Sequence, residues 1–201
     1  MKRQRGLSFF SLQMLWGTPH FLFLTMMLLC GALAGSFTGL RSGVSEGALL
    51  EQLAASMVAQ AQDTSSVGGL LLRAAGAALG WEAAALVAGM LRPHSLFLSA
   101  VCAARGFLIA FSAGALLSAL QWKGLLLAVL TGGVSAVFTV PCLLMTASAA
   151  FLSGLEAPRG RGGYWYAMGR YRGGVLLCVA LALVGGLLRV PMLFLAAQIP
   201  M

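Results

Sequence analysis

The stretch RGFLIAFSAGALLSAL, residues 105–120, decides the fold class of this 201-residue chain. It opens on a cation, Arg105, and carries no further charge. Small side chains recur at every fourth position, and on an α-helix that spacing places them on one face. They are Gly106, Ala110, Gly114 and Ser118. In a lipid bilayer, hydrophobicity does not drive helices together, and close backbone approach through small residues takes that role. The stretch therefore predicts a membrane-spanning helix that packs tightly on another helix.

The composition of the chain also points to a membrane. Hydrophobic residues make up 60% of the sequence and charged residues only 9%, with a mean hydropathy of +0.92. A soluble domain carries roughly a quarter charged residues, so these values exclude an ordinary soluble fold. We therefore expect an all-α, polytopic membrane helix bundle of about five transmembrane helices. Residues 1–201 are expected to form one integral membrane domain.

Apolar runs separated by polar segments mark the expected spans. They are residues 21–40, 68–91, 105–120, 124–146 and 173–196. Residues 95–104 are apolar but shorter than the roughly 20 residues that cross a bilayer, so we expect a half-helix or an interfacial segment there. Residues 41–66 form an amphipathic linker, which is either a helix on the membrane surface or a solvated helix packed on the bundle. Residues 147–172 are expected to be a basic loop.

The first span carries a second ladder of small residues. Gly31, Gly35 and Gly39 repeat the G-x-x-x-G spacing that packs membrane helices. The basic N-terminus, the apolar run and the tripeptide ALA at residues 32–34 also fit a secretory signal peptide with its cleavage site. Because the apolar run continues beyond that site, we expect residues 21–40 to be retained as a span.

The distribution of cations predicts the orientation. With the N-terminus in the cytoplasm, nine of the 13 Lys and Arg residues fall on inner segments and four on outer ones. The positive-inside rule favours this N-in, C-out topology, with the linker 41–66 outside and the loop 147–172 inside. The loop alternates arginine with aromatic residues, as nucleic-acid-binding segments do. A topology signal that contacts anionic lipid headgroups explains it more simply, so we expect the lipid bilayer, and no nucleic acid, as a partner.

Four ionisable side chains lie inside the expected spans or at their edges, where charge is costly and often functional. They are Glu82, Arg73, Arg105 and Arg189. Glu82 falls near mid-membrane and is the best candidate for a proton or ion site. Alternatively, the arginines snorkel to headgroups and Glu82 is protonated or paired for structural reasons. We favour this alternative because no second acid or histidine accompanies Glu82 along one path.

The sequence contains none of the patterns that mark common enzymes. It has no G-x-S-x-G, no H-E-x-x-H, no paired carboxylates and no phosphate-binding glycine loop followed by lysine. Its four cysteines, Cys30, Cys102, Cys142 and Cys178, stand at no metal-ligand or redox spacing and are interpreted as buried, inert thiols. We expect no catalytic, cofactor-binding or metal-binding residues.

Four segments form a pattern found in one bacterial family. They are GALAGSFTG in the first span, the outer linker, RGFLIAFSAG in the third span and the helix with Pro141. In these segments the chain resembles the stage II sporulation protein M family of endospore-forming bacteria. The residues that match the family's third-span motif are Arg105, Gly106, Phe111, Ser112 and Gly114. Ala110 replaces the family's usual glycine, and GVSA at residues 133–136 stands where members often carry a Leu-Pro-Gln-Asn-like turn.

This resemblance implies a non-enzymatic scaffold in the mother-cell membrane of a spore-forming bacterium. Such proteins hold cell-wall lytic enzymes, the stage II sporulation proteins D and P, while the forespore is engulfed. Glycine ladders suit that role because they offer faces to other membrane helices, including those of a second copy. We therefore expect the two small-residue faces to bind partner helices.

Two other functions fit the same sequence. A small permease-like subunit of an ABC-type transporter would use Glu82, the break at Gly132-Gly133 and Pro141 as movable parts. A general membrane-stress or assembly protein without a link to sporulation fits the same composition.

Overall fold

A computed structural model describes residues 18–45, 67–156 and 163–197, and every regular element in these ranges is helical. Five helices are long and apolar enough to cross a membrane. These spans are Pro19–Arg41, Leu71–Met90, His94–Ser118, Val134–Glu156 and Arg172–Met192. The structure confirms an all-α, multi-span fold.

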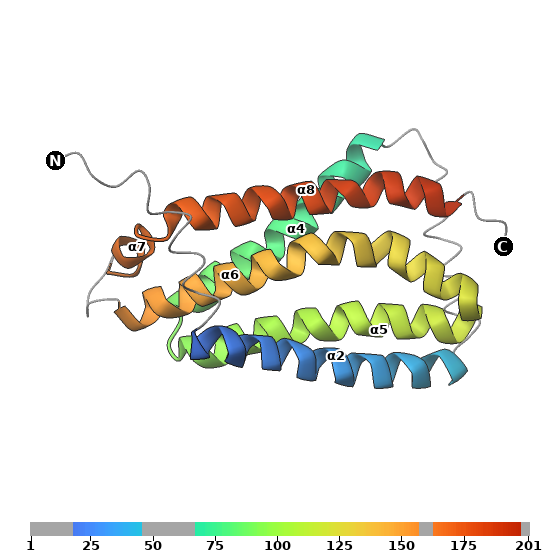
Figure 1. Ribbon diagram of the computed structural model, residues 1–201, viewed down its shortest axis with the longest axis horizontal. Coiled ribbons are helices and arrows are strands. Elements are labelled where there is room, and N and C mark those ends of the chain that lie inside the picture. The colour runs from blue at the N-terminus through green and yellow to red at the C-terminus, as the bar shows by residue number, and fades with distance from the viewer. Residues whose placement is uncertain (1–17, 46–66, 157–162, 198–201) are drawn as a thin grey trace.

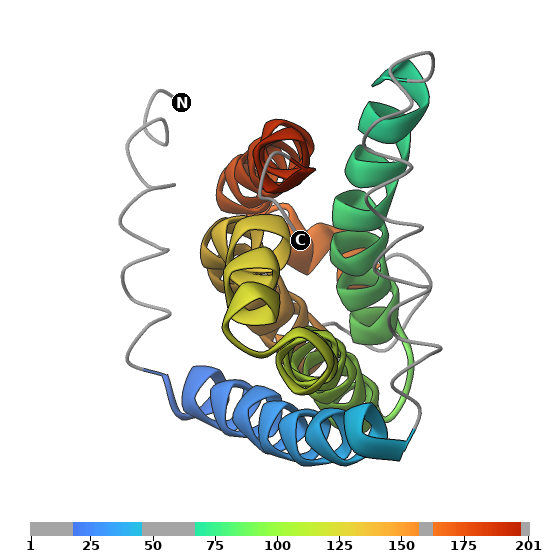
Figure 2. The ribbon, with the colours of Figure 1, turned by 90° about the vertical axis from the view of Figure 1, so that its right-hand side faces the viewer.

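The long helices α2, α5, α6 and α8 run roughly along the long axis of the molecule, α4 slants across them, and the short α7 lies at one end (Figure 1). They are α2 (Pro19–Ser45), α4 (Val67–Met90), α5 (His94–Ala128), the π-helix η2 (Val129–Gly133), α6 (Val134–Glu156), the short α7 (Gly163–Met168) and α8 (Arg172–Ala197). Viewed end-on, α6 lies between α8 and α5, α4 flanks this stack, and α2 covers the far side of α5 (Figure 2). The α6 span is 61% buried, against 17–28% for the others, so α6 is the central helix.

Backbone contact between α2 and α5 holds one side of the bundle. Gly31, Gly35 and Gly39 face α5, and a Cβ built on any of them would come closer than 3.0 Å to α5 backbone. The contact is mutual, because a Cβ on Gly106 would clash with the backbone of α2 at Leu28. Gly114 is nearly as close, since its Cβ would lie 3.1 Å from the Ser36 carbonyl oxygen. Both glycine ladders therefore pack within the chain.

The third span begins earlier than expected. Residues 95–104 are not a separate half-helix, because α5 runs without interruption from His94 through Arg105, and they belong to the apolar stretch His94–Ser118. Arg105 marked the expected membrane edge, yet its guanidinium lies over the Trp81 ring of α4, 5.2 Å from the ring centroid. A cation with such a partner can lie within a span, so Arg105 does not mark an end.

The fourth span lies further along the chain than residues 124–146. The helix breaks at Gln121, whose φ of 51° is left-handed, and the chain continues through α5 and η2 before the span Val134–Glu156 begins. The expected loop 147–172 is wrong over residues 147–156, which complete α6. The alanines and serines of residues 147–156 are buried, and Ser148 and Ser153 donate hydrogen bonds to carbonyls one turn back, at 2.8 and 2.7 Å. Serines satisfied in this way remain compatible with a buried helix.

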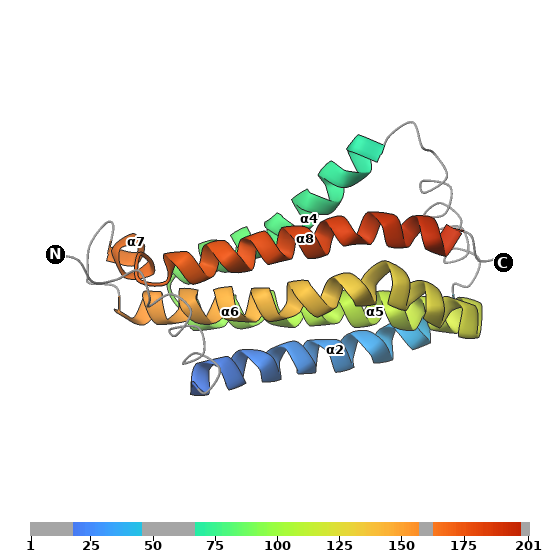
Figure 3. The same cartoon turned by 45° about the horizontal axis from the view of Figure 1, so that its top comes forward.

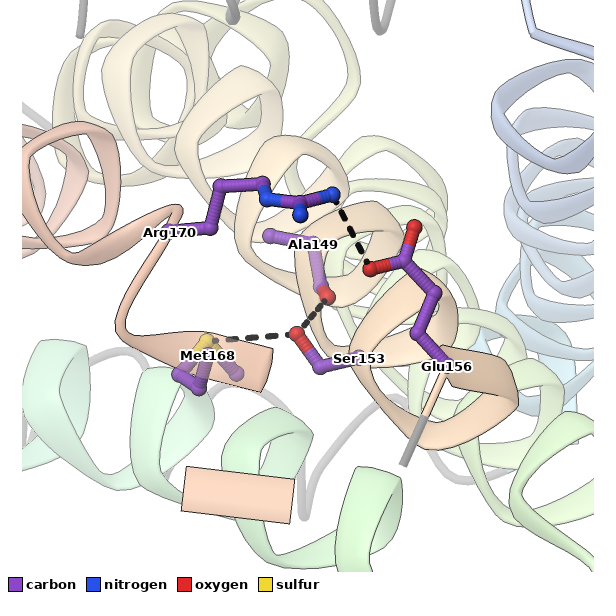
Figure 4. A network of polar contacts seen from close by, with 5 residues as sticks. All are labelled: Ala149, Ser153, Glu156, Met168 and Arg170. Carbon is purple, nitrogen blue, oxygen red and sulfur yellow. Dashed lines mark hydrogen bonds and ion pairs between the residues drawn. The ribbon is translucent and has the colours of Figure 1, made fainter. Parts of the chain in front are cut away.

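The described remainder of the basic segment, residues 163–172, packs on the end of the bundle. Tyr164 of α7 donates a hydrogen bond to the Leu86 carbonyl of α4 at 3.0 Å, and burial raises the pKa of this tyrosine to about 12. Ser153 lies 3.7 Å from the Met168 sulfur, and Arg170 pairs with Glu156 at 3.4 Å (Figure 4). Because both charged side chains are largely exposed, this ion pair contributes little stability.

Parts of three segments lie outside the described residues. The N-terminal segment before residue 18 and the amphipathic part of the linker, residues 46–66, are not described, whereas residues 41–45 end α2. Residues 157–162 of the basic loop also lie outside the described ranges.

We predict that Gly35→Ala destabilises the protein, whereas Gly76→Ala does not. Alanine stabilises a helix by about 1 kcal/mol relative to glycine. Both changes should therefore stabilise the protein if packing had no effect. At Gly35 the new methyl would meet the Phe107 backbone, whereas no described atom lies within 4 Å of it at Gly76. Overpacking costs about 1–3 kcal/mol. Thermal unfolding in detergent should show a lower Tm for Gly35→Ala only; equal Tm values would contradict the α2–α5 contact.

Candidate functional site

A buried carboxyl group lies in the middle of the bundle. Glu82 is near the centre of the span Leu71–Met90 and is only 2% exposed. Of the two acidic residues in the described ranges, the other, Glu156, lies at an exposed helix end. A buried ionisable group is costly unless neighbouring polar groups compensate it, so the surroundings of Glu82 define the candidate site.

The side chains around Glu82 come from three other helices. Thr146 of α6 places its hydroxyl beside the carboxyl group, and Arg105 of α5 lies within electrostatic reach. Cys142 of α6 and Cys178 of α8 are also within electrostatic reach of Glu82. Four helices therefore meet at one polar centre, which we call the Glu82 centre: Glu82, Arg105, Thr139, Cys142, Thr146 and Cys178.

Arg105 is anchored on two sides. Its guanidinium stacks over Trp81, next to Glu82 in the sequence, and Nη2 donates a hydrogen bond to Thr139 Oγ1 at 3.4 Å. Thr139 in turn donates to the Ser135 carbonyl at 3.0 Å. Because the aromatic ring and the hydroxyl both restrain the guanidinium, its positive charge is held close to the carboxyl group of Glu82.

Two buried polar atoms at this centre lack hydrogen-bond partners among the described residues. They are Oε2 of Glu82 and Oγ1 of Thr146, and Thr146 is completely buried. An unsatisfied buried polar atom costs about 1–3 kcal/mol. Because Thr146 lies beside the carboxyl group, its hydroxyl is the donor available to Oε2 of Glu82.

The four ionisable residues singled out in the sequence do not all meet. Glu82 and Arg105 lie together, and Arg189 of α8 is within electrostatic reach of Arg105 although its own side chain is exposed. Arg73 is exposed on the first part of α4. The centre thus combines one carboxyl group with one enclosed guanidinium, and Arg73 is not among the groups that surround them.

Sequence reasoning missed the residues of α6 that complete the centre. Thr139, Cys142 and Thr146 recur at intervals of three and four positions and therefore share one face of that helix. This spacing was a usable signal, although nothing in it indicated that the face meets Glu82. The proximity of Cys142 to Cys178 depends on the packing of α6 against α8 and has no local signal.

The expected partner faces on α2 and α5 are occupied within the chain. Gly31, Gly35, Gly39, Gly106 and Gly114 pack between these two helices. Ser118 donates its hydroxyl hydrogen to the Ala115 carbonyl of its own helix at 2.9 Å, and Ala110 is half-buried. A partner helix could use this surface only by displacing α2 or α5.

Comparisons with known proteins leave the family open. No protein-family model matches the sequence, and no curated protein and no solved structure matches it either.

We predict that Glu82 and Arg105 are energetically coupled. Arg105→Met removes the cation that acts electrostatically on the buried carboxyl group, and Glu82→Leu removes the acid that acts on the guanidinium. No direct ion pair joins these two described side chains, so each change should cost less than the roughly 3–5 kcal/mol of breaking a buried ion pair. The double variant should be destabilised by about 1–3 kcal/mol less than the sum of the single variants. Reversible unfolding in mixed micelles measures the three free energies, and strict additivity would contradict the coupling.

Proposed function

We propose that this protein is a non-enzymatic membrane scaffold of endospore formation. It would anchor cell-wall lytic enzymes, the stage II sporulation proteins D and P, in the mother-cell membrane during engulfment. Two features support the proposal: the resemblance in RGFLIAFSAG and GALAGSFTG, and a bundle of apolar helices that packs through small residues. An N-in, C-out orientation would place the linker 41–66 on the side of the lytic enzymes.

The observation that carries the proposal is an open glycine face on α4. No described atom lies within 4 Å of a Cβ built on Gly76 or Gly80, in contrast to the packed glycines of α2. Ala74 and Ala78, on another face of α4, contact Gly186 of α8. On the N-terminal side of this contact, the first turns of α4 diverge from α8 (Figures 1 and 3).

An open glycine face suits a helix-binding scaffold for a physical reason. In lipid, association depends on van der Waals packing and on close backbone approach, both of which small residues permit. Leu72 and Val87 on the same side of α4 are 78% and 55% exposed and can flank an incoming helix. The membrane helix of a lytic enzyme, or α4 of a second copy, could pack there without disturbing the α2–α5 contact.

We predict that Gly76→Leu/Gly80→Leu reduces co-purification of the two lytic enzymes. A leucine side chain would hold the partner backbone away from α4, and a loss of about 1.4 kcal/mol corresponds to a tenfold drop in affinity. Ala180→Leu is the matched control, because it adds the same side chain at an exposed site on α8. Capture of both enzymes at wild-type levels by the α4 variant would argue against this face.

A second experiment tests the proposal in the host organism. Deletion of the gene should block engulfment and lower the number of heat-resistant spores, and the α4 variant should complement poorly although it inserts normally. Unchanged spore counts in the deletion strain would reject the sporulation role while leaving the fold intact.

A permease-like subunit of an ABC-type transporter is the second candidate, favoured by the Glu82 centre and by the π-helix η2. Single π-helical turns often mark functional sites, and η2 is followed by Pro141 within α6. Glu82→Gln keeps the shape of the side chain and removes its acidic function. Loss of substrate flux in this variant, in a strain that retains the partner ATPase, would support transport, and unchanged flux would exclude this role for Glu82.

A further inference from the structure

Two of the four cysteines face each other in the interior. Cys142 of α6 and Cys178 of α8 are 5% and 2% exposed and pack together with Ala182 in a small cluster. Their thiols are close enough to interact directly. The other two lie elsewhere: Cys30 is exposed on α2, and Cys102 is buried in the larger apolar cluster.

Two further side chains near this pair carry soft or polar atoms. Met145 packs against the cluster and brings a thioether. Thr146 lies beside Cys178, and its fully buried hydroxyl has no hydrogen-bond partner among the described residues. That hydroxyl also lies beside the carboxyl group of Glu82, and it can donate its one hydrogen either to the carboxyl group or to the Cys178 sulfur.

The number of ligands selects the type of ion. The described residues contain no group of three or more His, Cys, Asp or Glu side chains arranged to hold a metal. Structural zinc sites use four ligands, and catalytic zinc sites use three. Two thiolates with a nearby thioether instead fit a soft monovalent ion, for which sulfur ligands are preferred.

We propose that Cys142 and Cys178 form a binding site for one Cu(I) ion. Two S–H bonds break, two Cu–S bonds form, and two protons leave to the solvent, with no change in the oxidation state of copper or sulfur. The bis-thiolate complex carries one negative charge. The guanidinium of Arg105 contacts α6 at Thr139, three residues before Cys142, whereas Glu82 is the ionisable carboxyl group within electrostatic reach of both thiols. Met145 is the third sulfur available to the ion, and Thr146 donates to the Cys178 sulfur.

The chain supplies its own matched controls for the test. The full-length protein is purified reduced and anaerobically in detergent, and Cu(I) is titrated in competition with bicinchoninate. Wild type should bind one Cu(I) per chain, and so should Cys30→Ser and Cys102→Ser. Cys142→Ser and Cys178→Ser should each weaken binding by at least about a hundredfold, since each removes one of two thiolates. Absence of Cu(I) binding in wild type, or wild-type binding by the Cys142→Ser/Cys178→Ser variant, would overturn the site.

X-ray absorption on the copper-loaded wild type tests the site without any variant. We expect a first shell of sulfur alone, with two short Cu–S bonds and at most one longer contact from a thioether. A shell of nitrogen or oxygen ligands would overturn the proposal, even if the serine variants unfolded and gave no usable titration.

Discussion

The structure depends on direct contact between the backbones of α2 and α5. Inside a bilayer, two apolar helices gain little from leaving lipid, and their attraction comes from atoms brought into van der Waals contact. Glycine allows that contact, and at Gly31, Gly35 and Gly106 a single Cβ would already clash with the opposing backbone. With one face of α5 sealed by α2, its other face is left for α4 and α6. That arrangement directs Arg105 towards Trp81 and the interior.

The Glu82 centre follows from this arrangement of helices. Because α6 is surrounded by neighbours, polar side chains along it are shielded from lipid and can meet those of α4, α5 and α8. A carboxyl group, a guanidinium, hydroxyls and thiols thus share a small interior region. Low effective dielectric strengthens each interaction there and raises the cost of each unsatisfied atom. The three proposed roles would use different parts of the same bundle. A scaffold would use the open face of α4, a permease-like subunit the break at η2, and Cu(I) binding the pair Cys142–Cys178.

Much of the helix packing was accessible from the sequence, whereas the span boundaries and the site were not. Small residues four positions apart lie on one face of a helix, and this follows from local geometry without knowledge of the tertiary packing. Gly31, Gly35 and Gly39 could therefore be assigned to a helix contact from the sequence alone. Arg105 misplaced the start of the third span because its neutralising neighbours belong to other helices. Residues 147–156 suggested a loop because serine and alanine are weakly apolar, yet they are helical and buried, and their serines donate hydrogen bonds to carbonyls one turn back. The meeting of Glu82 with Cys142, Thr146 and Cys178 is purely tertiary, and no local pattern encodes it.

The most direct measurement concerns the distance between α2 and α5 in a real bilayer. Magic-angle-spinning NMR on liposome-embedded protein, with ¹³C at the Gly35 Cα and at the Phe107 carbonyl carbon, reports whether these two backbones touch. The packing in which a Cβ on Gly35 would lie 2.9 Å from that carbonyl carbon predicts a strong cross-peak at short mixing times. Absence of the cross-peak, with both labels visible and the helices intact, would contradict the arrangement on which the Glu82 centre depends.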